Sequence, residues 1–142
     1  MGLDQSVHAI PKRRIKKKGK FFHPYEVCKN HDELEELMSW RNHWNLCVWM
    51  NRLYYRKGGK LGLHEGYCVS FRLNERDLDA FERAIQEKEL YGYKLRDSRD
   101  DRPAGSPDDE FDRYCLINDQ EFLKKARQAI KDGKAVVYHD WW

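Results

Sequence analysis

The sequence predicts a single α+β domain over residues 1–142, in which about three helices pack on one face of a small, mainly antiparallel sheet. Two observations support this prediction. Strand-like segments occur near both ends and in the middle of the chain, and helix-like segments lie between them. Aromatic residues make up 13% of the 142 residues, so the chain has large apolar side chains for one core although 36% of its residues are charged.

The sheet is expected to take its strands from three segments. Residues 3–10 (LDQSVHAI) lack a helical period and are followed by Pro11, which cannot donate a ladder hydrogen bond. Residues 67–73 (YCVSFRL) and 135–142 (AVVYHDWW) are rich in the β-branched and aromatic residues that favour strands. An N-terminal, a middle and a C-terminal strand therefore form the predicted sheet.

A long tryptophan-rich helix is expected between the first two strands. Asn30 or Asp32 could cap its start, and the glycines after Lys57 are typical of a helix end. The KGGKLG sequence at that end lacks the spacing of a phosphate-binding loop, so a turn is the preferred interpretation. The second half of this helix is apolar almost all round, which predicts a position in the middle of the protein.

One face of this helix collects Trp40, Trp44 and Cys47, because these residues fall on a single stripe at 3.6 residues per turn. The spacing favours a buried core over an exposed binding site. Asn51 falls in the same stripe, and a buried amide needs partners. We expect Asn51 to bond to the backbone of a neighbouring strand.

Two further helices are predicted in the second half of the chain. Asn74 caps a segment in which Leu78, Phe81 and either Ala84 or Ile85 recur at helical spacing. Asn118 or Asp119 is expected to cap the third helix, which then runs through residue 130. Residues 94–110 between them are acidic and contain proline and glycine, so they are expected to form a mobile loop.

The strongest functional signal is a basic arm at about residues 11–22, which holds seven lysines or arginines within nine positions. Such a density suits a polyanion, and neighbouring Phe21, Phe22 and Tyr25 could stack on bases. The alternatives are docking to an acidic protein surface and a solvated hairpin that only aids solubility. Arg41 and His43 flank the tryptophan stripe and could hold a ligand's charge. The predicted partner-binding residues are Lys12, Arg13, Arg14, Lys16, Lys17, Lys18, Lys20, Arg41 and His43.

Metal binding and catalysis are less well supported. The pairs formed by His43 with Cys47, by His64 with Cys68 and by Cys28 with His31 lack the standard zinc spacings, so no metal and no cofactor is expected. The four cysteines are expected to be reduced thiols. His8 and His139 lie on the first and last predicted strands and could face each other, but structural histidines are the preferred interpretation.

The chain lacks an apolar run of the roughly 20 residues that a membrane span needs, and its start lacks the apolar stretch of an export signal. A cytosolic protein without a membrane partner is therefore expected.

The opening Met1-Gly2-Leu3-Asp4, the Trp40-Arg41 pair followed by Trp44, and the segment 67–90 resemble a group of small phage-encoded proteins that begin with MGLD. The resemblance covers these four residues and roughly positions 34–90. It implies a phage origin and an accessory role in the host cytosol, and it transfers no catalytic residue.

The sequence therefore predicts a phage accessory protein that binds a host protein complex or nucleic acid, for host takeover or counter-defence, without catalysis. The alternative is a small enzyme that acts on nucleotides or nucleic-acid phosphodiesters.

Overall fold

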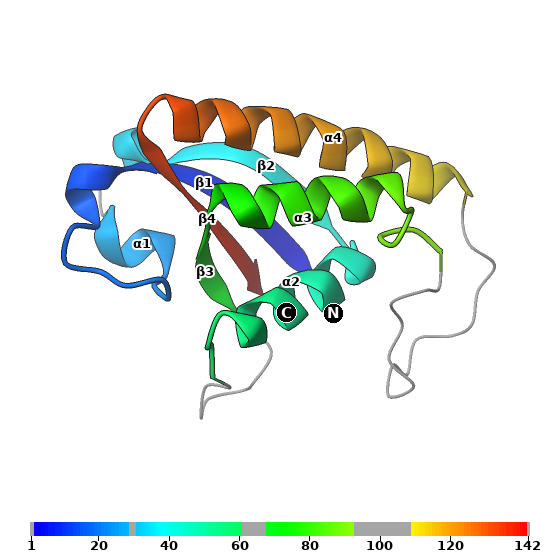
Figure 1. Cartoon of the computed structure of the whole chain (residues 1–142), viewed down its shortest axis with the longest axis horizontal. Helices are drawn as coiled ribbons and strands as arrows, with labels where there is room; N and C mark the ends of the chain where they lie inside the picture. Colours follow the sequence, from blue (N-terminus) through cyan, green and yellow to red (C-terminus); the bar gives the residue numbers. More distant parts are fainter. Residues whose placement is uncertain (1, 29–30, 61–67, 93–108, 142) are drawn as a thin grey trace.

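The computed structural model describes residues 2–28, 31–60, 68–92 and 109–141. Strands and helices are interspersed along the chain (Figure 1). In chain order they are β1 (Asp4–Pro11), the 3-10 helix η1 (Lys12–Arg14), α1 (Pro24–Val27), the 3-10 helix η2 (His31–Glu33), β2 (Glu35–Arg41), α2 (Trp44–Arg56), β3 (Ser70–Leu73), α3 (Glu75–Gln86), α4 (Asp109–Lys131) and β4 (Lys134–Trp141).

The strands form one four-stranded sheet in the order β2-β1-β4-β3, with every neighbouring pair antiparallel. The central pair joins distant parts of the chain, since Asp4 lies opposite Trp141 and Pro11 lies opposite Lys134. The predicted α+β class and the three predicted strands are confirmed. The fourth strand, β2, was not predicted.

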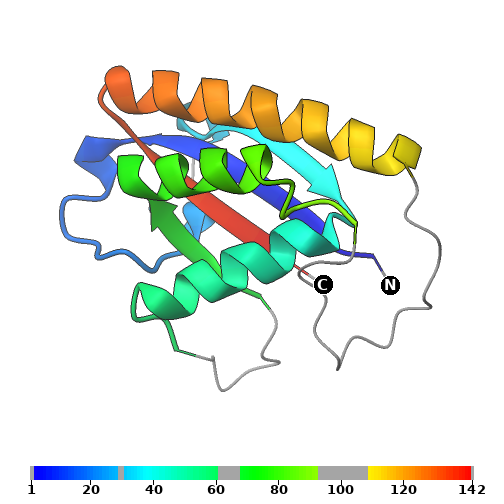
Figure 2. The ribbon, with the colours of Figure 1, turned by 45° about the vertical axis from the view of Figure 1, so that its right-hand side comes forward.

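The sheet has two faces with different coverings. We call the face covered by α2, α3 and α4 the inner face, and Figure 2 shows these three helices lying side by side over it. Alternate residues of the central strands, such as Val7 and Tyr138, point into this layer and are fully buried. The opposite, outer face carries Ile10 and Val137, which pack with residues of the arm between β1 and β2.

Segment 35–41 is a strand, so the prediction of one helix from about residue 32 to residue 56 was wrong. The chain turns at Asn42, which has a φ of 60° in the left-handed region that asparagine tolerates. The Asn42 backbone N–H donates to the Leu3 carbonyl at 2.8 Å, and its side chain accepts from the Leu3 N–H at 2.9 Å. Helix α2 begins only after this turn, at Trp44.

The predicted stripe of Trp40, Trp44 and Cys47 is only partly in the core, where Trp49 from outside the stripe is also buried. Trp40 of β2 and Trp49 of α2 are buried, whereas Trp44 is only half-buried. Edge-on ring contacts run from Trp40 to Phe122 of α4, from Phe122 to Phe81 of α3, and from Phe81 to Trp49, with centroid distances of 5.2, 5.2 and 5.3 Å. This aromatic chain joins β2 to all three covering helices, and such contacts add stability beyond area burial.

Helix α2 is not enclosed on all sides, which corrects the expectation of an all-round apolar helix. Arg52, Tyr55 and Arg56 are exposed along one side of it. Asn51 donates to the Cys47 carbonyl at 2.6 Å and to Asp140 at 3.4 Å, instead of bonding to a strand's backbone. Its amide therefore joins a buried polar group beneath the helix.

Helix α3 begins as predicted. The Asn74 side chain accepts from the Asp77 N–H at 2.9 Å, and the Asp77 carboxylate accepts from the Asn74 N–H at 2.9 Å, which forms a reciprocal capping box. Lys57 at the end of α2 forms an ion pair with the same carboxylate. One buried aspartate thus holds the end of α2 and the start of α3 together.

Helix α4 starts at Asp109, about ten residues before the predicted cap at Asn118 or Asp119. The expected loop at 94–110 lies outside the described residues, apart from Asp109 and Glu110 in the first turn of α4. Asp119 is fully buried in mid-helix, because its carboxylate binds other side chains instead of capping.

Candidate functional site

The basic arm between β1 and β2 is attached to the outer face at several points. Ile15 and Phe22 are buried against outer-face residues of the sheet. The Arg72 N–H of β3 donates to the Lys20 carbonyl at 2.8 Å. Burial of Phe22 also corrects the prediction that it could stack on a base, whereas Phe21 and Tyr25 are exposed.

The two arginines of the arm are engaged inside the molecule. Arg14 donates from Nε to Glu33 at 2.6 Å, and Arg13 bonds to the other oxygen of the same carboxylate. The hydrogen bond between Arg14 and Glu33 raises the pKa of the Arg14 guanidinium and lowers the pKa of the Glu33 carboxyl group. Both arginines therefore anchor the arm to the η2 turn.

The lysines of the arm are arranged differently from the arginines. All five lysines are exposed, and within the described residues no carboxylate lies in ion-pair distance of any of them. Anchored backbone and outward ammonium groups give a fixed positive surface, which we call the lysine loop. It consists of Lys12, Lys16, Lys17, Lys18 and Lys20.

Of the two further predicted binding residues, the structure brings only Arg41 to the surface. The Arg41 side chain is 72% exposed and lies 3.9 Å from the Asp4 carboxylate. His43 is 2% exposed, so its predicted contact with a partner was wrong. The imidazole turns inward because a buried carboxylate, Asp119, lies beneath the start of α2.

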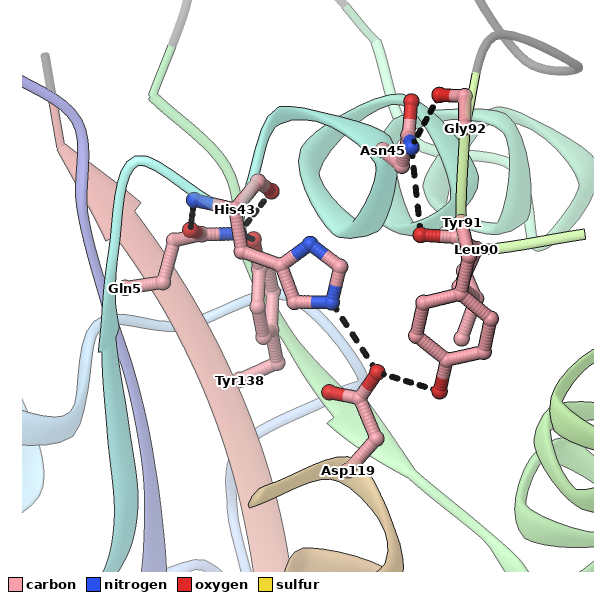
Figure 3. Close-up of polar contacts among 8 residues, drawn as sticks. All are labelled: Gln5, His43, Asn45, Leu90, Tyr91, Gly92, Asp119 and Tyr138. Atoms are coloured by element: carbon pink, nitrogen blue, oxygen red, sulfur yellow. Dashed lines mark hydrogen bonds and ion pairs between the residues drawn. The ribbon is translucent and has the colours of Figure 1, made fainter. Parts of the chain in front are cut away.

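His43 belongs to a buried polar network at the junction of β2 and α2, shown in Figure 3. Its Nε2 lies 2.9 Å from the Asp119 carboxylate, which also accepts from the Tyr91 hydroxyl at 2.9 Å. The Gln5 side chain accepts from the His43 N–H and donates to the His43 carbonyl, both at 3.1 Å. Burial, followed by the charge of Asp119, raises the pKa of Tyr91. This network is structural, since it joins strand β1, α2, α4 and the segment after α3.

A second polar group lies on the outer face, where β4 meets the arm. His139 and His23 approach with their Nε2 atoms 3.2 Å apart, and Ser70 Oγ lies 2.6 Å from His139 Nδ1. The Tyr25 N–H donates to His23 Nδ1 at 3.1 Å. Burial lowers the pKa of both imidazoles, that of His139 to about 4.

These contacts determine where the protons lie on the two neutral rings. His23 accepts at Nδ1, so its proton is on Nε2 and is donated to His139 Nε2. The proton of His139 is then on Nδ1, and Ser70 Oγ accepts it. A serine that accepts from a histidine is not activated as a nucleophile by it. The arrangement therefore serves to dock the arm on β4.

His8 and His139 do lie on neighbouring strands, as predicted, but His8 is 5% exposed and burial lowers its pKa. The four cysteines are free thiols. Among the residues that the structure describes, no group of three or more His, Cys, Asp or Glu side chains is placed to hold a metal ion. His64 lies outside that set.

Beside the arm, the outer face is open and forms a hollow of about 450 Å³ over β2, β1 and β4. Six large hydrophobic side chains are exposed in the described parts of the chain, and three of them line this hollow. They are Tyr25, Tyr114 and Trp141, which are 47%, 56% and 65% exposed. The other lining residues are Asp4, Gln5, Ser6, Glu36, Ser39, Trp40, Arg41 and His139.

Sequence reasoning missed most of this hollow. Tyr114 falls outside every element that the sequence predicts, and Trp141 falls on a predicted strand that indicates no role for it. The alternation of β4 could have indicated that His139 and Trp141 share the face opposite Tyr138. The approach of His23 to that face depends on the fold of the arm, which has no sequence signature.

No protein-family model matches the chain, and no curated protein or solved structure is significantly similar to it. Among the helices of the described residues, none combines the length and the apolar character that crossing a membrane requires.

Proposed function

We propose that this chain is a phage-encoded accessory protein that acts in the host by binding nucleic acid, or a host complex that contains it, without chemistry of its own. The lysine loop makes the electrostatic contact with the phosphate backbone, and the loop is part of the outer face of the sheet. The observation that supports this proposal is the separation of roles within the arm. Its arginines and apolar residues hold it on the domain, and its lysines point to solvent without a carboxylate partner among the described residues.

A loop that only aided solubility would not need such anchoring. Holding five ammonium groups at one end of a sheet keeps like charges together, which costs free energy in the unbound protein. A polyanion that neutralises them removes this cost and releases its own counterions. The arrangement is therefore better matched to a phosphate backbone than to solvent.

The proposal is tested with a variant in which the five lysines of the loop are replaced by glutamine. Arg13 and Arg14 stay in place because they bind Glu33. A matched control removes five exposed bases from α3 and α4, on the other side of the sheet: Arg76, Arg83, Lys124, Lys125 and Lys131. Both variants change the net charge equally, so only the position of the charges differs.

Binding is measured by fluorescence anisotropy with labelled oligonucleotides at several salt concentrations. Five phosphate contacts predict a slope of about −3.5 for log K against log salt on a single strand. The loop variant should lose most of this slope and bind at least about tenfold more weakly, while the control variant should resemble the wild type. Equal losses in the two variants would mean that net charge, and not the loop, drives binding. A host protein captured after nuclease treatment, and lost with the loop variant, would identify an acidic protein surface as the partner.

A further inference from the structure

We infer that the hollow on the outer face holds an unpaired nucleobase that carries an exocyclic amino group, so that the protein selects single-stranded nucleic acid. This inference rests on the proposed function, since it names the form of nucleic acid that the lysine loop would bring to the sheet. Three features of the hollow support it: its aromatic rim, its unpaired carboxylate and its position relative to the cations.

The aromatic rim is the first feature. Exposed aromatic rings cost solubility, and three of the six exposed large hydrophobic side chains of the described residues surround this one hollow. They come from three different elements, because Tyr25 is on α1, Tyr114 on α4 and Trp141 on β4. Aromatic rings at such a site stack on bases of any sequence, but only where those bases are not already stacked in a duplex.

The second feature is the carboxylate of Glu36, which lies in the lining and is exposed. Within the described residues it has no cationic partner, whereas the other carboxylate, Asp4, lies beside Arg41. A carboxylate only accepts hydrogen bonds, so it binds groups that present N–H. Unpaired cytosine presents the two N–H donors of its N4 amino group, whereas unpaired thymine presents a single N3–H between two carbonyl oxygens that repel a carboxylate. Glu36 therefore favours cytosine over thymine.

The third feature is the distribution of charge along the outer face. Arg41 is at the edge of the hollow, and the lysine loop lies beyond the opposite ends of β1 and β4, next to Pro11 and Lys134. A strand that follows the sheet can thus place phosphates on cations at both ends and a base in the hollow between them. The volume of about 450 Å³ is in the range of small-molecule sites.

The first experiment compares an eight-residue deoxycytidine oligomer with a hairpin duplex of equal length, for the wild type and three variants. Trp141→Ala and Tyr114→Ala should each weaken binding to the single strand by about tenfold and leave duplex binding unchanged. Tyr55→Ala is the control, because Tyr55 is 44% exposed on α2 and does not line the hollow. Trp141→Phe keeps an aromatic ring and should restore most of the affinity. If duplex and single strand bind alike, or if all three alanine variants behave alike, the inference fails.

The second experiment compares deoxycytidine and thymidine oligomers at pH 7.5. The wild type should bind the deoxycytidine oligomer about tenfold more tightly than the thymidine oligomer, because a hydrogen bond to a charged group contributes about that much affinity. In Glu36→Gln the amide can also donate to a thymine oxygen, so the preference should fall to near one. Glu26→Gln removes a charge from α1, outside the hollow, and should keep the preference. Equal wild-type affinity for both oligomers would overturn the role of Glu36.

The two proposals fail in different ways. If the lysine-loop variant loses binding but the hollow variants do not, the loop binds nucleic acid and the hollow does not take a base. If the hollow variants lose single-strand binding but the loop variant does not, the base site stands and the lysine loop is not the contact. If the wild type binds neither the single strands nor the duplex, both proposals are overturned.

Discussion

Lowering the pH from 7 to 5 should change the contributions of two neighbouring residues of β4 to stability in opposite directions. His139 faces outward against His23, and Asp140 faces inward, where it accepts from the Val69 N–H at 2.9 Å and from the Tyr138 hydroxyl at 3.0 Å. Burial lowers the pKa of His139 from an ordinary 6.5 to about 4 and raises the pKa of Asp140 from 3.8 to about 6. Each shift makes the charged form less favourable in the folded protein than in the unfolded chain.

The signs follow from linkage between protonation and folding. The unfolded chain binds a proton at His139 more readily, so stability is lost as the pH falls from about 6.5 towards 4. The folded protein binds a proton at Asp140 more readily, so stability is gained as the pH falls from about 6 towards 4. Between pH 7 and pH 5, His139 should lower the free energy of unfolding by about 2 kcal/mol, and Asp140 should raise it by about 1 kcal/mol.

Urea unfolding at pH 7 and pH 5 tests this with the wild type, His139→Gln and Asp140→Asn. From pH 7 to pH 5, the change in the free energy of unfolding should be about 2 kcal/mol more favourable for His139→Gln than for the wild type. For Asp140→Asn this change should be about 1 kcal/mol less favourable than for the wild type. His8 and His23 also have lowered pKa values and are present in all three proteins, and glutamine is chosen at position 139 so that His23 keeps a hydrogen-bond partner. The reasoning is refuted if both variants change the pH dependence in the same direction, or if neither changes it.

Three further predictions concern stability and are measured by urea unfolding at pH 7. Trp40→Ala should lose about 3 to 5 kcal/mol of unfolding free energy as a large-to-small core change. Trp141→Ala changes a site that is 65% exposed and should lose less than about 1 kcal/mol. Similarly small losses in both variants would show that Trp40 is not in the core. Asn74→Ala should lose about 1 kcal/mol with the α3 cap, and Asn74→Ser should recover most of it, so equal losses would contradict the capping role. Asp119→Ala should lose about 3 kcal/mol, because it leaves His43 and a tyrosine without their buried acceptor; a neutral result would count against the network.

The features that the sequence predicted correctly depend on local rules. Asn74 followed by Asp77 is a capping pattern that needs only neighbouring residues, and the β1 and β4 segments contain enough strand formers to be recognised. The lysines of the arm could be placed on the surface because charge density alone excludes burial.

Strand β2 was missed because its side chains do not alternate. The register with β1 shifts between Val7 and His8, so consecutive Leu37 and Met38 both pack on the inner-face core, as does Trp40. Positions 37, 38 and 40 are also compatible with one side of a helix, and a local pattern cannot distinguish the two. Only the pairing with β1 makes this segment a strand.

The candidate site was harder to predict than the fold, because its residues come from separate elements. His43 looked like a boundary residue until a carboxylate more than 70 positions away bound its ring. Tyr114 and Trp141 line one hollow only because α4 and β4 lie near β2 and β1. Such convergence depends on tertiary packing, which no local rule supplies.

The pairing of β1 with β4 also has a consequence for the synthesis of the chain. The two central strands are the first and last strands of the described protein, so the contact order is high and the central ladder closes a very large loop. A ribosome-bound chain that has not yet released β4 leaves the apolar Val7 and Ile10 of β1 without their ladder partners. We therefore expect folding to wait until β4 has emerged from the ribosome, which makes the nascent chain a substrate for chaperones until then.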